Sequence, residues 1–169
     1  MNGPEFIARA VETGSLFDFS IGAKLAEAEK KIALEYFDEL QGRRGARTLR
    51  RDYGLFEAAF SDESDWTCRS ITLEIHRLAS MPELAARVRG LTGINLTPYT
   101  KWTDVAEALH GLVGCLPFDS PTVTQGYRTY RSRNTGVSVI VIDDASSERG
   151  TYPGNGDIWG LDIVDPRFL

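Results

Sequence analysis

The chain has no long apolar run and few cysteines, and both shortages restrict what it does. Nowhere do about 18 consecutive apolar residues occur, so the sequence predicts no membrane-spanning helix. The opening MNGPEFIARAVETG lacks a basic start followed by an apolar block, so we expect no secretion signal. Cys68 and Cys115 lie too far apart for a disulfide framework or a metal-ligand spacing. We therefore expect a reduced, cytoplasmic protein, and 169 residues are enough for a single domain.

Motifs that carry known catalytic chemistry are also missing. There is no G-x-S-x-G, no Walker loop and no G-x-G-x-x-G, and the only histidines are His76 and His110. His76 alternates with Thr72 and Glu74, so we expect it to be exposed on a strand. A pair between Cys68 and His76 would have to span roughly 25 Å along that strand. These absences favour a protein that is not an enzyme and holds no cofactor.

Basic charge is scarce overall and unevenly distributed. The net charge is −5, yet five arginines and no acid lie between Arg43 and Arg51. From Asp143 to the C-terminus, six acids stand against two arginines. An acidic surface disfavours nucleic acid and anionic lipid as partners and favours a basic protein. We interpret the arginine runs as charges on edge strands, which resist sheet-to-sheet aggregation.

The positive signal in the sequence is a pattern that occurs twice. Apolar spacing predicts amphipathic helices over 22–34 and 100–114, the second with Thr103 as N-cap and Gly114 as its stop. Each is followed by a basic strand, a turn ending in Gly, an apolar strand, an acidic loop and a third strand. Two similar halves, about 15–80 and 100–165, would be joined by a linking helix near 82–91 that begins at Pro82, and a further helix would precede them.

The fold class follows from that order. We predict an α+β fold, a tandem α-β-β-β repeat whose antiparallel strands form two sheets or one, with helices packed on one face. Antiparallel sheets tolerate an open second face. The segment VSVIVI is apolar on both sides, which is typical of a central strand, and leaves its exposed face undecided.

The aspartates near the C-terminus admit an enzymatic alternative. A metal-dependent hydrolase would use Asp143, Asp144 and Asp157 as ligands. Adjacent residues of a strand point to opposite faces, however, and no histidine follows His110. A solvated rim of charged loops is the simpler interpretation.

Two acidic loops with aromatic residues, SDESDW and ERGTYPGNGDIW, favour binding to a protein. We expect Tyr152 to be exposed in its turn, whereas Trp159 shares a face with Leu161 and Ile163 and is expected in the core. The candidate partner-binding residues are Glu57, Asp62, Glu63, Asp65, Trp66, Glu74, Asp143, Asp144, Tyr152 and Asp157.

Two resemblances bear on function. The segments YGLFEAAFSDESDWTCRSITLEIHRL and GYRTYRSRNTGVSVIVIDD resemble immunity-type proteins that accompany actinobacterial polymorphic toxins. The order of helices and strands is similar to that of β-lactamase inhibitory proteins, although the disulfides of that family are absent. The resemblance implies a stoichiometric inhibitor that blocks a basic toxin domain in the cytoplasm, and it transfers no catalytic residues.

Overall fold

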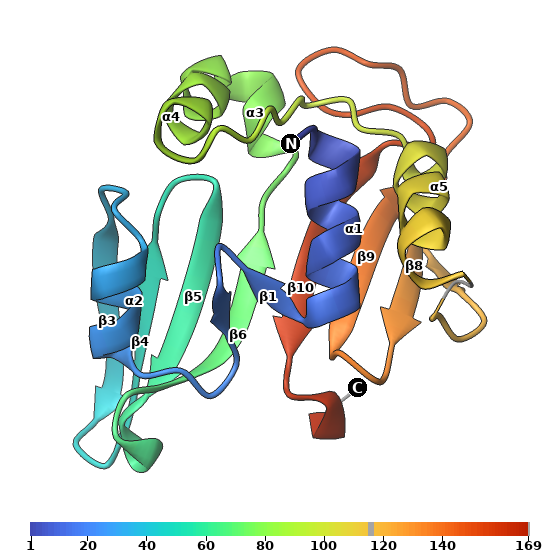
Figure 1. Cartoon of the computed structure of the whole chain (residues 1–169). Helices are drawn as coiled ribbons and strands as arrows, with labels where there is room; N and C mark the ends of the chain where they lie inside the picture. Colours follow the sequence, from blue (N-terminus) through green and yellow to red (C-terminus); the bar gives the residue numbers. More distant parts are fainter. Residues whose placement is uncertain (115–116, 169) are drawn as a thin grey trace.

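The computed structural model describes residues 1–114 and 117–168. It consists of one large antiparallel sheet with helices over one of its faces (Figure 1). The strand order is β3-β4-β5-β6-β10-β9-β8-β7, and a small β1-β2 hairpin lies apart from this sheet. The predicted α+β class is confirmed, and of the two arrangements expected for the strands it is the single sheet that forms.

Five α-helices are present in the described part of the chain. None of them is long and apolar enough to cross a membrane. They are α1 (Gly3–Thr13), α2 (Leu25–Lys31), α3 (Arg77–Ser80), α4 (Pro82–Thr92) and α5 (Trp102–Val113), with single 3-10 turns at Asp62–Ser64 and Pro166–Phe168.

The strands are short, as is usual for antiparallel sheets. They are β1 (Ser15–Leu16), β2 (Phe19–Ser20), β3 (Phe37–Arg43), β4 (Ala46–Asp52), β5 (Phe56–Ser61), β6 (Thr67–Leu73), β7 (Thr122–Thr124), β8 (Tyr127–Ser132), β9 (Val137–Ile142) and β10 (Ile158–Val164).

The helix ends show how local chemistry sets the boundaries. Asn2 caps α1 by accepting from the backbone N–H of Glu5, whose carboxylate accepts in return from the N–H of Asn2. Helix α4 begins at Pro82, as predicted. Helix α5 ends at Gly114 in a left-handed conformation, also as predicted, but its N-cap is Lys101 and not Thr103. The helix expected over 22–34 is shorter than predicted and spans only Leu25–Lys31.

The two halves of the chain repeat the same order of elements with one strand more than predicted. Helix α2 precedes β3 to β6, and α5 precedes β7 to β10. Strands β6 and β10 pair antiparallel in the middle of the sheet, and the remaining strands follow outward in matching order on either side. An approximate two-fold axis therefore passes between β6 and β10, and the equivalent loops 62–66 and 143–157 lie at opposite ends of the sheet.

The added outer strands change the position of the arginine-rich ones. Strand β4 lies between β3 and β5, and β8 lies between β7 and β9. The expectation that these strands form the sheet edges is therefore wrong, because β3 and β7 cover them. Strand β9, the segment VSVIVI, lies between β8 and β10 and is almost entirely buried, as predicted for a central strand.

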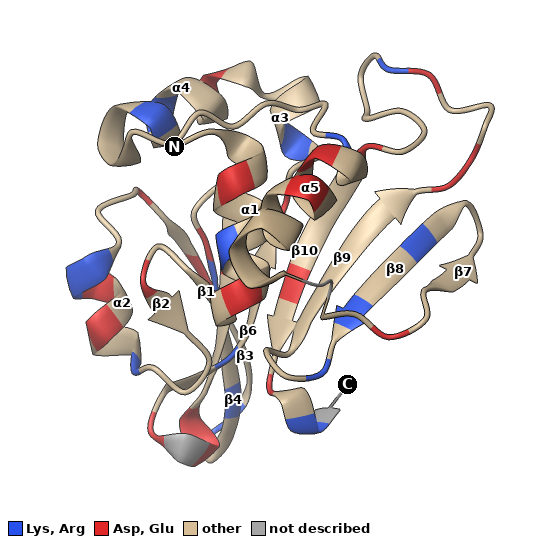
Figure 2. Cartoon of the chain, turned by 45° about the vertical axis from the view of Figure 1, so that its right-hand side comes forward, with Lys and Arg blue, Asp and Glu red and all other residues tan. Residues whose placement is uncertain are grey.

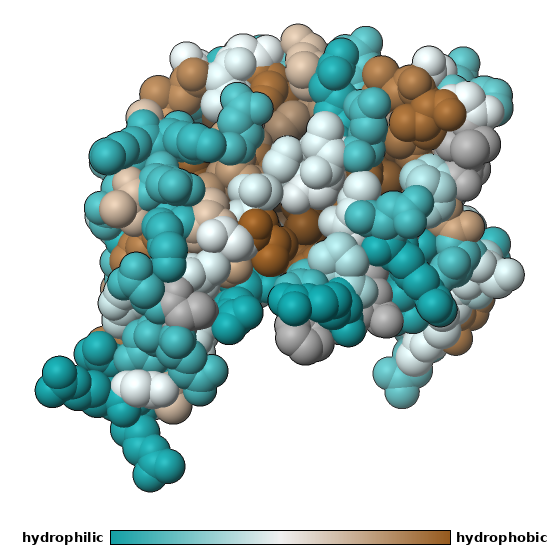
Figure 3. Space-filling model, turned by 60° about the horizontal axis from the view of Figure 1, so that its bottom comes forward, coloured by the Kyte–Doolittle hydropathy of each residue, from teal (hydrophilic) through white to brown (hydrophobic). Residues whose placement is uncertain are grey.

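One face of the sheet forms the core. The strands contribute alternating apolar side chains to this face, and α1, α2 and α5 pack on top of them. We call the opposite side the open face. Seen from the end that carries the β3–β4 turn, the outline on the side of the open face is hollowed between two projecting arms (Figure 3). The twist of a sheet of this width accounts for the hollow.

Candidate functional site

Carboxylates from four strands or their ends gather on the open face. Register places Asp52 of β4 opposite Glu57 of β5, Glu57 opposite Thr72 of β6, and Thr72 opposite Asp162 of β10. Directly paired residues point to the same side of a sheet, so these side chains form one row across it. Glu74 follows at the end of β6. Figure 2 shows the acidic position in the middle of β10.

Arg77, at the start of α3, ties part of this row together. Its guanidinium donates to Asp52 at 3.1 Å and to the carbonyl of Gly54 at 2.9 Å, and it also pairs closely with Glu57. The nearest oxygen of Glu74 lies farther away, at 3.8 Å. Arg50 reaches the other oxygen of Glu57 at 3.0 Å. Three carboxylates of the row thus share two guanidiniums, and Asp162 adds a fourth negative charge, which leaves an excess of negative charge in the middle of the open face.

Glu74 and Asp162 are the least neutralised members of the row. Burial raises the pKa of Asp162, and a hydrogen bond with Thr72 offsets this only in part. Burial also raises the pKa of Glu74, and although Arg77 opposes it, the neighbouring carboxylates Glu57 and Asp162 add to the rise. Glu74 therefore has only Arg77 to stabilise its charged form, and it shares that guanidinium with two other carboxylates of the row. In the described part of the chain no basic side chain pairs with Asp162.

An aromatic cluster adjoins the carboxylates on the same face. Trp159 stacks on the imidazole of His76 with ring centroids 4.0 Å apart and an interplanar angle of 6°. Tyr152 stacks beside Trp159 at 5.8 Å, and Tyr127 meets it edge-on at 5.7 Å. The Nδ1 atom of His76 lies 3.3 Å from Glu74, which joins the cluster to the row of carboxylates.

Two expectations fail at this cluster. A β-bulge between Ile158 and Gly160 shifts the register of β10, so Trp159 lies on the open face and not in the core with Leu161. His76 lies on the same side as Glu74, as expected, but it follows the end of the strand and is only 21% exposed because Trp159 covers it. Burial lowers the pKa of His76.

A cavity of about 350 Å³ lies next to the aromatic cluster. Tyr127 and Ile142 line it from strands β8 and β9, and the loop between β9 and β10 lines it as well. That loop contributes Tyr152, Asp144 and Ser147. The cavity therefore combines aromatic walls with a carboxylate at its rim.

The candidates from the first acidic loop lie at the other end of the sheet. Asp62 is nearly buried and accepts from the backbone N–H of Arg47 at 2.7 Å and from its Nε at 2.8 Å, so it holds the β3–β4 hairpin in place. Trp66 is half-buried against the core beneath the guanidinium of Arg47. Glu63 and Asp65 are exposed. Of these four residues, only Glu63 and Asp65 offer a carboxylate to solvent.

The candidates from the second acidic loop also divide into buried or paired residues and exposed ones. Asp157 is fully buried, where it accepts from Arg149 at 2.7 Å and lies 3.5 Å from Lys101, so its expected role at a surface is wrong. Asp143 pairs with Arg128 at 2.9 Å. Tyr152 is 57% exposed, as predicted.

The three aspartates of the metal-dependent alternative do not converge on one point. Asp143, Asp144 and Asp157 each have their own partners, and Asp144 accepts from Ser146 and Ser147 within its turn. Within residues 1–114 and 117–168, no group of three carboxylate, histidine or cysteine side chains is placed to hold a metal ion.

The open face thus unites Glu57, Glu74 and Tyr152 from the predicted set and adds residues that the sequence did not reveal. Asp52 and Asp162 were not predicted, because only the register between distant strands brings their carboxylates into one row. Arg77 and Trp159 depend on the end of β6 and on the bulge in β10, which no periodicity announces.

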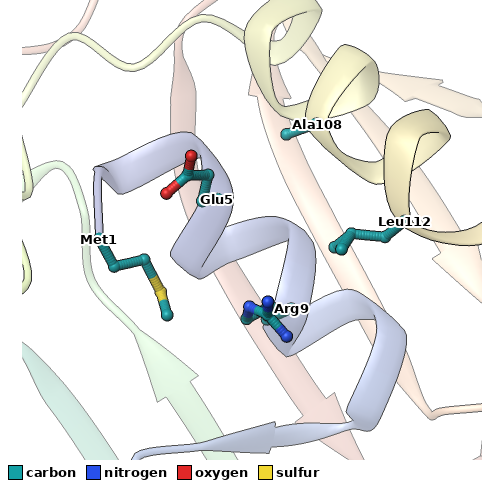
Figure 4. A pocket seen from close by; sticks show the side chains of 5 residues that line it. All are labelled: Met1, Glu5, Arg9, Ala108 and Leu112. Atoms are coloured by element: carbon teal, nitrogen blue, oxygen red, sulfur yellow. The ribbon is translucent and has the colours of Figure 1, made fainter.

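A second hollow lies between α1 and α5 on the opposite side of the molecule and measures about 400 Å³ (Figure 4). Met1, Ala108 and Leu112 make its wall largely apolar. Glu5 and Arg9 bring one charge of each sign, so the side-chain charges of its lining cancel. It has fewer charged and aromatic side chains with which to bind a ligand than the open face.

Comparison with protein families, with curated proteins and with solved structures finds nothing that matches this chain.

Proposed function

We propose that this chain is a non-catalytic protein-binding module that docks a basic protein on its open face. In keeping with its resemblance to immunity-type proteins, the partner is a bacterial toxin domain, which the chain neutralises in the cytoplasm by covering it stoichiometrically. Such an inhibitor makes and breaks no bonds. It needs only a complementary surface.

One observation supports this proposal above the others, namely the unbalanced row of carboxylates beside an aromatic cluster, with Tyr152 exposed, in a hollowed sheet face. Aromatic residues are enriched at the centres of protein interfaces. Complementary charge accelerates encounter and selects the correct partner. A basic side chain from the partner would supply a cation to Asp162 and a second one to Glu74, which shares Arg77 with two other carboxylates.

The proposal places binding on the open face and not on the two acidic loops together. Loops 62–66 and 143–157 lie at opposite ends of the sheet, so a single compact domain would not reach both without crossing the face between them. The β9–β10 loop still takes part through Tyr152, which stacks at the upper end of the open face.

The test compares two variants of equal charge. Glu39 of β3 lies directly opposite Arg50 on the open face and pairs with it at 3.0 Å. Glu39→Lys with Glu74→Lys alters the open face, and Glu63→Lys with Asp65→Lys alters the far end of the sheet. Each pair changes the net charge by the same amount, so long-range steering changes similarly. A toxin-like domain sought in the neighbouring reading frame serves as the ligand, and calorimetry gives the dissociation constant.

We expect the open-face variant to bind about 100-fold more weakly, because like charges placed opposite each other at an interface cost several kcal/mol. The far-end variant should stay within a few-fold of the original chain. Equal losses for both variants, or no loss for either, would show that the open face is not the binding surface.

A further inference from the structure

The cavity beside Trp159 resembles sites that this chain fills with its own arginines. Three of its arginines each lie over an aromatic ring and also pair with an aspartate at 2.7–2.8 Å, which combines a cation–π contact with a charge-assisted hydrogen bond. These sets are Arg47 with Trp66 and Asp62, Arg51 with Tyr36 and Asp38, and Arg149 with Tyr99 and Asp157.

The cavity contains the same two ingredients without the arginine. Tyr127, Tyr152 and Trp159 supply the rings, Asp144 supplies the carboxylate, and among its described lining residues there is no basic side chain. One face of Trp159 is taken by His76, whereas Tyr152 remains 57% exposed. An incoming planar cation therefore has a ring to stack on.

Asp144 is held ready to accept a further hydrogen bond. Its Oδ1 accepts from the backbone and hydroxyl of Ser146, and its Oδ2 accepts from Ser147 at 3.2 Å. A carboxylate offers about four acceptor positions, so one remains for a ligand. The bonds from Ser146 also lower the pKa of Asp144, so it is ionised at neutral pH.

We propose that this cavity receives an arginine side chain of the partner, which stacks on Tyr152 and pairs with Asp144. The proposal rests on the function proposed above and adds to it the residue that the partner inserts. Arginine fits better than lysine because its planar guanidinium both stacks and donates in a fork, as the three internal sets do.

The test uses a small probe in place of the partner. Nα-acetyl-arginine methylamide is titrated into the protein at constant ionic strength, and the indole N–H signals of Trp66, Trp102 and Trp159 are followed by NMR. The matched control is the citrulline analogue, which keeps the shape of arginine but lacks its charge. Trp159→Phe assigns the signal.

We expect a saturable shift of the Trp159 signal with a dissociation constant in the millimolar range, little change at the other two tryptophans, and no saturation with citrulline. Tyr152→Ala and Asp144→Asn should each weaken the probe about fivefold, in line with one exposed cation–π or ionic contact. Asp119→Asn, at the other end of β8, should leave it unchanged.

A linear shift without saturation, or the same response to arginine and citrulline, would overturn the proposal, and this comparison needs only the unaltered chain. Because the titration requires no partner, its failure does not touch the charge-reversal experiment. Equally, if charge reversal on the open face did not weaken binding of the partner, the result of the arginine titration would be unaffected.

Discussion

Two aspartates of the second half have opposite effects on stability, although the sequence does not distinguish them. Burial tends to raise the pKa of Asp157, but the hydrogen bond from Arg149, the N–H of Gly154 and the charge of Lys101 outweigh it, so the pKa is lowered. A lowered pKa means that the carboxylate stabilises the fold above its unfolded pKa of about 4.

Asp157→Asn should therefore lower the free energy of unfolding by about 2 kcal/mol at pH 7, because it leaves Arg149 and Lys101 facing a neutral amide. The loss should shrink as pH falls below about 4 and through the lowered pKa, where the original carboxylate becomes protonated. Urea unfolding at pH 7 and at pH 3 measures both values. A loss of equal size at the two pH values would contradict the ionic role of Asp157.

Asp162 should behave in the opposite sense. Its pKa is raised because it is buried, so its contribution is fully present below the unfolded pKa of about 4 and is lost as pH rises through the folded value. Asp162→Asn keeps a partner for Thr72 and removes the charge. We expect a higher unfolding midpoint than the original chain at pH 7 and no gain at pH 3, measured by the same urea series. A lower midpoint at pH 7 would show that Asp162 has a cation partner in solution.

At the scale of the elements, two turns between strands need glycine for different reasons. One needs both a positive φ and the absence of a Cβ atom, and the other needs only the positive φ. Gly136 lies in the β8–β9 turn with φ of 72°, and a Cβ atom there would come within 1.9 Å of the carbonyl oxygen of Val164. Gly45 lies in the β3–β4 turn with φ of 84°, and a Cβ atom there would meet nothing within 4 Å. Both conformations cost a non-glycine residue about 1–2 kcal/mol, and only the first adds a clash.

Gly136→Ala should therefore destabilise the protein by clearly more than Gly45→Ala, with a difference of about 2 kcal/mol or more, because the added Cβ would collide with the Val164 carbonyl oxygen and because the N–H of Val164 donates to the carbonyl of Gly136 at 3.0 Å. Thermal unfolding of both variants gives the comparison. Equal losses would mean that the end of β10 moves aside at little cost.

The elements that sequence reasoning missed share a physical cause. Strand β3, with the sequence FDELQGR, has little apolar alternation and is a strand because it pairs with β4 at the edge of the sheet. Strand β7 has only three residues, all exposed. Propensity for strand structure depends on neighbours more than on the residues themselves, so such edges are invisible in the sequence. The helices expected near 82–91 and over 100–114, whose periodicity reflects a core, were predicted close to their observed bounds, whereas the helix expected over 22–34 forms only over Leu25–Lys31.

At the scale of the whole molecule, the two halves share one core. Strands β6 and β10 join them by backbone pairing, and α1, which precedes the first half, packs against α5 of the second. We therefore expect the prediction of a single domain to hold in solution. Calorimetry should show one transition whose enthalpy equals the van't Hoff value, about 120 kcal/mol near 60 °C for a chain of this length. Two separable transitions would show that the halves fold independently.

The sequence alone determined the class of fold, the order of the repeated elements apart from the outer strands β3 and β7, and the buried face of most strands, since each of these follows from local periodicity and turn chemistry. The open face was decided only by tertiary structure. Its carboxylates come from four strands spread over more than a hundred residues, and strand register places them side by side. A single bulge in β10 turned Trp159 outward. Such features arise from pairing between distant segments, and no stretch of sequence carries them by itself.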